Sequence, residues 1–143
     1  MRVDLCFIGS SISSFGVRIL AALAQKEYPD TALYFVITRN IYGLGNIFGS
    51  TDTKYLPQQD ATNLARHFVN TDVICLSSFS EHAQLTEVLI AEIRKYNRDA
   101  MIIWGGPHAT SAPEDSIDHS DAICIGEGEI AFLEVLKRVK KGD

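Results

Sequence analysis

Long hydrophobic runs are missing from this 143-residue sequence. None approaches the roughly 20 apolar residues that a helix needs to cross a bilayer. The first residues, MRVDLCFIGSS, also lack the long apolar core and the small-residue cleavage site of a secretory signal peptide. We therefore expect no membrane span, a first segment that forms a strand, and a cytoplasmic location.

Cysteine is scarce, and its positions do not suggest a disulfide or a metal site. Cys6, Cys75 and Cys124 are odd in number, each lies in an apolar run, and no two of them form a CxxC pair. We expect buried, reduced thiols that behave as small hydrophobic side chains.

The sequence also lacks an excess of positive charge. Its formal net charge is −5, which argues against a nucleic-acid-binding protein. Hydrophobic residues make up 46% and charged residues 22%, the balance of an ordinary globular protein. The length suits one domain over residues 1–143. Basic residues gather only at the far end, where they suit the last turn of a helix: Lys137, Arg138, Lys140 and Lys141.

Several common site motifs are absent from the sequence. The segment GSSISS, after the first apolar run, has one glycine where a dinucleotide-binding fold needs GxGxxG. A Walker A loop and a GxSxG nucleophile turn are missing, and Ser77 and Ser78 stand where a response-regulator receiver has an aspartate. The four histidines lack metal-ligand spacing. We predict no catalytic and no metal-ligating residue.

Five apolar segments predict β-strands, and amphipathic segments between them predict helices. The strands are expected at Val3–Gly9, Ala32–Thr38, Asp72–Ser78, Met101–Trp104 and Ala122–Ile125. The helices are expected at Phe15–Tyr28 (with Gly16, Ile19, Leu20 and Leu23 at helical spacing), Gln58–Val69, Ala83–Tyr96, from Ala112 onward, and Ile130–Lys140.

This alternation predicts an α/β fold with a doubly wound, five-stranded parallel sheet between two helical layers. A Rossmann-like sheet with the flavodoxin-like strand order 2-1-3-4-5 fits best, with a ligand crevice near the first and third strands. Residues 39–57 form a long glycine-containing segment, in which the aromatic residues Tyr42 and Phe48 look exposed. Segments of that length inside a domain are often functional.

Small and hydroxyl-bearing residues follow the strands at the edge where their carboxyl ends meet. Two of the expected strands end in glycine-rich turns, Gly105-Gly106-Pro107 and Gly126-Glu127-Gly128, and the first ends in serines. Glycine lets a ligand approach the backbone, and ligands of open parallel sheets bind at this edge. The edge therefore suits a large polar ligand with amide and phosphate groups, held without a nucleophile.

The stretch WGGPHATSAPEDSIDHSDAICIGEGE, together with FGVRILAAL near the start, closely resembles the amino-terminal cobalamin (B12)-binding domain of cobalamin-dependent radical SAM enzymes. Ser11 to Gly16 fits the DxHxxG frame of wider cobalamin-binding domains, with serine in place of both aspartate and histidine. The resemblance covers essentially the whole chain. It implies these cofactor-binding residues: Ser10, Ser11, Ser13, Gly16, Ser77, Ser78, Phe79, Gly105, Gly106, Pro107, His108, Thr110, Gly126, Glu127 and Gly128.

Serine at position 13 changes what can ligate the cobalt, because a hydroxyl is a poor axial ligand. The resemblance implies base-off cobalamin, with its nucleotide tail against the third, fourth and fifth strands and no protein histidine below the cobalt. His108 and His82 lie on other loops of the same edge, where local hydrogen bonding is the more common role.

The resemblance also implies a partner. The cluster motif CxxxCxxC is absent from the sequence, so the 4Fe-4S cluster and S-adenosylmethionine would belong to a C-terminal radical SAM domain of a longer protein. The module alone would catalyse nothing; the full-length enzyme would transfer methyl groups or perform related radical chemistry. Two alternatives stay open: a flavodoxin-like module that binds FMN at the Ser10 to Ser14 loop, and a cofactor-free docking scaffold.

Overall fold

The computed structural model describes residues 1–38 and 58–142 of the chain. Tyr42 and Phe48, with the rest of the segment from 39 to 57, lie outside the described residues. The strands are β1 (Val3–Gly9), β2 (Ala32–Ile37), β3 (Val73–Ser78), β4 (Met101–Gly105) and β5 (Ala122–Ile123). The helices are α1 (Phe15–Gln25), α2 (Gln58–Ala65), α3 (Ala83–Tyr96), α4 (Gly106–Ser111), α5 (Pro113–His119) and α6 (Glu129–Lys141), with 3-10 turns η2 (Arg66–Phe68) and η3 (Ser80–His82).

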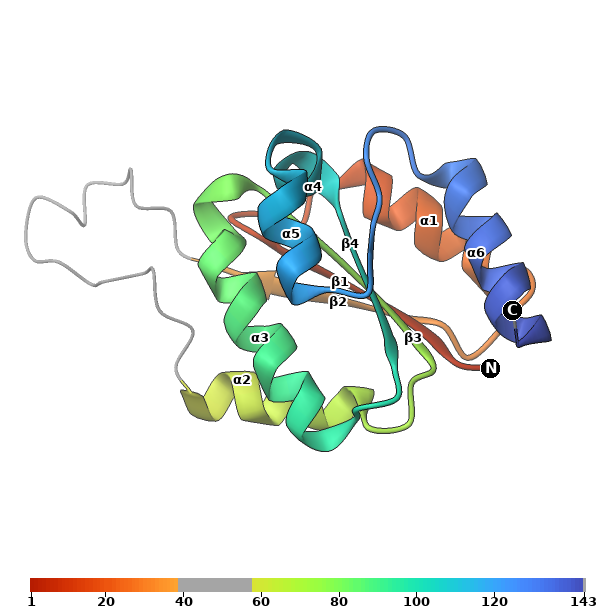
Figure 1. The fold of residues 1–143 in the computed structure, drawn as a ribbon, viewed down its shortest axis with the longest axis horizontal. Coiled ribbons are helices and arrows are strands. Elements are labelled where there is room, and N and C mark those ends of the chain that lie inside the picture. Colours follow the sequence, from red (N-terminus) through yellow and green to blue (C-terminus); the bar gives the residue numbers. More distant parts are fainter. Residues whose placement is uncertain (39–57, 143) are drawn as a thin grey trace, which may run out of the picture.

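The strands form one parallel sheet in the order β2-β1-β3-β4-β5, which confirms the predicted fold class (Figure 1). In Figure 1, α1 and α6 lie together on one side of the sheet, and α2 and α3 lie on the other. Every residue of β1 is buried, because this strand has a helical layer over both faces. None of the helices among residues 1–38 and 58–142 is long and apolar enough to cross a membrane.

Each face of the sheet has its own hydrophobic core. On the α3 side, Leu85, Leu89 and Ile93 pack with Trp104 and Phe68. On the other side, the buried residues of α1 and α6 pack with alternate residues of β1 and with Cys75 and Ile103: Val17, Ala21, Ala24, Phe132 and Leu136. The thiols of Cys6 and Cys75 are buried, as predicted, and Cys124 is half-buried.

Three local predictions were wrong. Helix α1 is present as predicted and Leu20 packs against the core, but the fully buried residues are Val17, Ala21 and Ala24, and Ile19 is 46% exposed. The expected turn after β4 is instead the first turn of α4, which Pro107 starts well. The last strand is only two residues long, Ala122–Ile123, and ends before the predicted Ile125 because the chain turns away toward Gly126, whose φ is +73°.

The buried carboxylate of Asp4 stabilises the edge of the sheet where the strands begin. Asp4 is fully buried in β1 and accepts hydrogen bonds from Thr71 Oγ1 (2.5 Å), Arg2 Nε (2.9 Å) and the backbone N–H of Ala32 (3.1 Å). These donors come from three segments, so this one side chain joins β1 to the starts of β2 and β3.

We predict that Asp4→Asn lowers the free energy of unfolding by about 2–3 kcal/mol, because an amide cannot accept all of these bonds and the Arg2 guanidinium loses its carboxylate partner. Urea denaturation would measure this loss. The matched control is Asp72→Asn, whose side chain is 56% exposed and accepts from the Arg2 backbone. That change should cost less than about 1 kcal/mol. Equal effects in both variants would contradict the role given to Asp4.

Candidate functional site

The carboxyl edge of the sheet contains a crevice between the ends of β1, β3, β4 and β5. Its volume is about 270 Å³. It is lined by residues of four segments that are far apart in sequence, and it brings together many of the predicted site residues: Gly16, Ser77, Phe79, Gly105, Gly106, Pro107, Gly126, Glu127 and Gly128. Parallel strands create this arrangement, because all their carboxyl ends meet at one edge.

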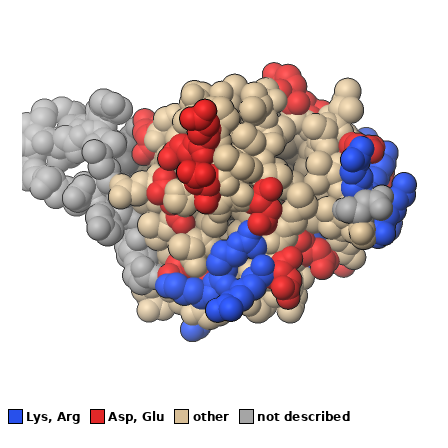
Figure 2. All heavy atoms as spheres, viewed as in Figure 1, with Lys and Arg blue, Asp and Glu red and all other residues tan. Residues whose placement is uncertain are grey.

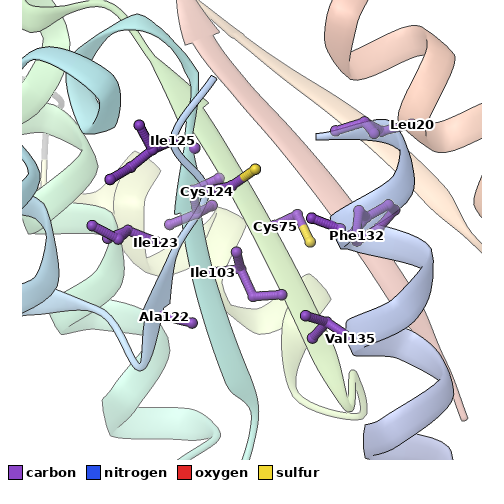
Figure 3. Close-up of a pocket in the computed structure, with 12 residues that line it drawn as sticks. Leu20, Cys75, Ile103, Ala122, Ile123, Cys124, Ile125, Phe132 and Val135 are labelled. Atoms are coloured by element: carbon purple, nitrogen blue, oxygen red, sulfur yellow. The ribbon is translucent and has the colours of Figure 1, made fainter. Parts of the chain in front are cut away.

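An apolar cavity of about 160 Å³ lies beside the crevice, between the sheet and α6. Figure 3 shows Ile103 and Cys75 of the sheet facing Phe132 and Val135 of α6 across this space. Leu20, Gly105 and Cys124 line both the cavity and the crevice, so the two spaces adjoin. A polar ligand in the crevice could therefore place an apolar group in the cavity.

Thiols form part of the wall of this cavity. Burial raises the pKa of Cys75 above its usual range, and burial followed by the nearby Glu129 carboxylate raises the pKa of Cys124. Both thiols therefore stay protonated near neutral pH. They act as small apolar wall groups, which agrees with their predicted character.

Glycine is required at the turn after β4. Gly106 has a φ of +89°, and a Cβ there would lie 2.5 Å from Ser77 Oγ and 3.2 Å from the Ser78 nitrogen. The first turn of α4 can therefore pack against the end of β3 only if residue 106 carries no side chain. Gly16 is different, because a Cβ there would meet no atom within 4 Å.

Thr110 joins the two glycine turns. Its hydroxyl donates to the Gly106 carbonyl (3.1 Å) and accepts from the Gly126 N–H (3.1 Å). The turns after β4 and β5 are thereby held side by side, beyond the last backbone pairing of their strands. Thr110 itself does not line the crevice, and its hydroxyl is engaged within the protein.

Two other predicted residues point into the fold. Ser78 is fully buried and its hydroxyl accepts from Trp104 Nε1 (3.0 Å). His108 is 5% exposed, with Nδ1 3.1 Å from Ser80 Oγ and Nε2 3.0 Å from Asp115 Oδ2. Both ring nitrogens of His108 are therefore engaged in local hydrogen bonds, and its ring lies against Trp104.

The other edge histidine, His82, is also held inside the protein. Its Nε2 lies 2.6 Å from Thr38 Oγ1, and its Nδ1 is buried without a hydrogen-bond partner among the described residues. Burial lowers the pKa of His82 below its ordinary value, partly offset by the neighbouring Glu81 carboxylate. Its ring is neutral at neutral pH and does not face the crevice lining.

The serine loop after β1 is exposed. Ser11 and Ser13 are hydrogen-bonded to each other through their hydroxyls (2.5 Å), and Arg18 of α1 supports the loop through the Ile12 carbonyl (2.7 Å). Ser10 lies outside the main crevice, in a neighbouring hollow with Phe79 and Pro107. The loop therefore flanks the crevice and leaves the Ser13 side chain accessible.

Apart from Gly105, the cavity-lining residues were missed by sequence reasoning. Leu20, Cys75, Phe132 and Val135 look like ordinary core residues in the sequence, because apolar periodicity does not distinguish a packed side chain from one that faces a void. The only usable signal was the position of Ile123, Cys124 and Ile125 directly before the glycine turn, which predicted a strand end but not a cavity.

Comparison of the sequence with known proteins gives evidence on the family of the chain that does not depend on the geometry of the crevice. Residues 2–136 match the family model of the B12 binding domain. The chain is also 24% identical over 139 residues to a protein of Pyrococcus horikoshii named uncharacterized methyltransferase PH0819. That alignment covers 94% of this chain and 26% of the archaeal protein, so the chain spans about a quarter of its relative's length.

We predict that Gly106→Ala lowers the free energy of unfolding by about 1–3 kcal/mol, because alanine is strained at positive φ and its methyl would meet Ser77. Thermal or urea denaturation would measure the effect. Gly16→Ala is the control, since this exposed helical position has room for a methyl group and should be unchanged or gain about 0.5–1 kcal/mol. A neutral Gly106→Ala variant would show that the turn relaxes without cost.

Proposed function

The chain belongs to the B12-binding domain family, and on this premise we propose that it holds a base-off cobalamin in position for a radical SAM catalytic domain. The observation that carries the proposal is the apolar cavity that adjoins the glycine-lined crevice. Together the two spaces match a ligand that is polar and amide-rich over most of its surface and carries an aromatic base at one end.

The cavity fits the aromatic base of the nucleotide tail. A dry apolar cavity of about 150 Å³ holds a benzene molecule, and this one has a similar volume of about 160 Å³ and shares three lining residues with the crevice. Its walls come from Ile103, Phe132 and Val135, which supply apolar contact without a charged group. An aromatic base could enter without leaving a buried charge unpaired.

The crevice fits the polar part of the cofactor. Bare backbone at Gly105, Gly106, Gly126 and Gly128 lets amide and phosphate groups approach peptide N–H and carbonyl groups. The bound cofactor would supply a cobalt centre that carries a transferable methyl group. The contribution of this chain would be to bind and orient it.

The absence of a histidine at position 13 supports the base-off form without a protein ligand below the cobalt. The Ser13 hydroxyl is exposed and already bonded to Ser11, and serine is a poor ligand for cobalt. His108 is not a ready substitute, because Ser80 and Asp115 engage both of its nitrogens.

A partner domain over the carboxyl edge is supported by an apolar rim. Large hydrophobic side chains are exposed around the crevice on three connections that follow β1, β3 and β5: Ile12 (59%), Phe15 (78%), Phe79 (47%), Ile125 (57%) and Ile130 (86%). Exposed apolar groups gathered at one edge are typical of a surface that another body covers. The proposed partner is a radical SAM domain in the same polypeptide, which would hold the 4Fe-4S cluster and S-adenosylmethionine, in the cytoplasm.

The direct test is the absorption spectrum of purified protein after incubation with hydroxocobalamin and desalting. We expect retained cobalamin with a base-off spectrum. In Ser13→His we expect a shift toward a nitrogen-ligated spectrum, because the exposed position gives an imidazole access to the ligand. FMN is the matched competitor: retention of FMN but not cobalamin would favour the flavodoxin-like alternative, and retention of neither would favour the docking scaffold.

A second prediction concerns the cavity. Ala122→Phe places a ring among the cavity walls and should reduce cobalamin retention at least tenfold with little change in melting temperature, because the ring occupies the place of the aromatic base. Ala22→Phe, on the exposed face of α1, is the control and should retain cobalamin like the wild type. Val135→Phe tests the opposite wall if the first variant is unstable. Undiminished retention in folded variants would contradict the placement of the base.

A further inference from the structure

Three side chains of the types that bind metals meet between α3 and α5, outside the crevice and the cavity. One ligand atom each of Glu87, Asp115 and His119 lies within 4.8 Å of the other two. We propose that these residues form a binding site for a divalent transition metal, with Zn²⁺ the best fit. The site is separate from the proposed cobalamin site, and none of its residues lines that site.

The local structure explains why these three residues meet. Asp115 and His119 are four residues apart on α5, so their side chains lie on the same face of the helix. Glu87 projects from α3 toward that face, and its Oε2 lies 3.9 Å from His119 Nε2. A metal ion here would link two helices that belong to different parts of the sequence.

The charge balance of the cluster favours a cation. Among residues 1–38 and 58–142, no lysine or arginine forms an ion pair with Glu87 or Asp115. Other acidic residues nearby do have such partners: Asp121 pairs with Arg94, and Glu92 pairs with Lys95. Figure 2 shows acidic side chains over α5 and the adjoining part of α3, with basic side chains gathered toward the lower end of α3. Two carboxylates this close repel each other unless a positive charge lies between them.

A buried residue orients one of the ligands. Asp115 Oδ2 accepts a hydrogen bond from His108 Nε2 (3.0 Å), and His108 is 5% exposed and fixed at its other nitrogen by Ser80. Metal-binding carboxylates are usually held by such a second hydrogen-bond partner. The bond leaves the other oxygen of Asp115 available to a metal ion.

The set of donors selects the kind of metal. One imidazole nitrogen and two carboxylate oxygens suit Zn²⁺, and Co²⁺ or Ni²⁺ with similar ligands, with water completing the coordination. Ca²⁺ and Mg²⁺ prefer oxygen-only sites. Both His119 and Asp115 are exposed enough for an ion to enter from solvent, at 42% and 53% side-chain exposure.

The test is titration of tag-free protein with Zn²⁺ by calorimetry, followed by Co²⁺ with absorption spectroscopy. We expect one Zn²⁺ per chain and a raised melting temperature, with visible Co²⁺ bands that lack the strong near-ultraviolet absorption of thiolate ligation. His119→Ala and Glu87→Gln should each weaken Zn²⁺ binding about tenfold or more. Both positions are at least partly exposed, so the variants should fold like the wild type.

The matched control is His67→Ala, which removes another exposed histidine on η2. This variant should bind Zn²⁺ like the wild type. The proposal is overturned if the wild type shows no saturable Zn²⁺ binding, or if folded His119→Ala and Glu87→Gln bind as tightly as it does. A thiolate band with Co²⁺ would place the metal at a cysteine instead. Cobalamin plays no part in these measurements, so their outcome is independent of the proposed function.

Discussion

Burial of β1 and β3 on both faces is the constraint on which the rest of the structure depends. A strand covered on both sides is apolar along most of its length and keeps buried polar groups only where partners satisfy them, and its connecting helices lie above and below the sheet. The polar and glycine-rich segments can then lie only at the two ends of the strands. At one end Asp4 gathers the donors that hold the strands together, and at the other the ends of four strands surround the crevice. The buried polar network around Asp4 and the crevice thus lie at opposite edges of one sheet.

The sequence was sufficient for the fold because the signals that specify it are local and strong. Continuous apolar runs marked the strands, and their alternation with helices left few possible topologies. Where the structure differs from the sequence-based prediction, the cause lies in the packing between elements and in backbone conformation. The close approach of α1 depends on Ala21 and Ala24, which carry little hydrophobic signal of their own. The short length of β5 depends on the turn at Gly126, whose backbone conformation cannot be read from the residue type alone.

The sequence predicted a site at the carboxyl edge of the sheet but could not predict how its residues pack. The predicted glycines and Ser77 line one crevice at that edge, whereas Ser10, Ser11, Ser13 and Ser78 lie outside its lining. The sequence could not show that His108 and Ser78 turn inward, because their partners Asp115, Ser80 and Trp104 come from separate elements. The cavity and the cluster of Glu87 with Asp115 and His119 were hidden for the same reason: each is assembled from residues that only the packing of distant segments brings together.

The hydroxyl of Thr110 adds one hydrogen bond between the segments that follow β4 and β5, beyond the last main-chain bond between them. Main-chain pairing of β4 with the final segment ends at the bond from the Cys124 N–H to the Trp104 carbonyl, and the next connection runs through a side chain. A main-chain hydrogen bond between strands cannot break unless a strand moves. The bond from the Gly126 N–H to the Thr110 hydroxyl needs only a rotation of the Thr110 side chain to break, at the cost of about one exposed hydrogen bond. The spacing of the two glycine turns therefore depends on the side chain at position 110 and not on the backbone pairing of the strands.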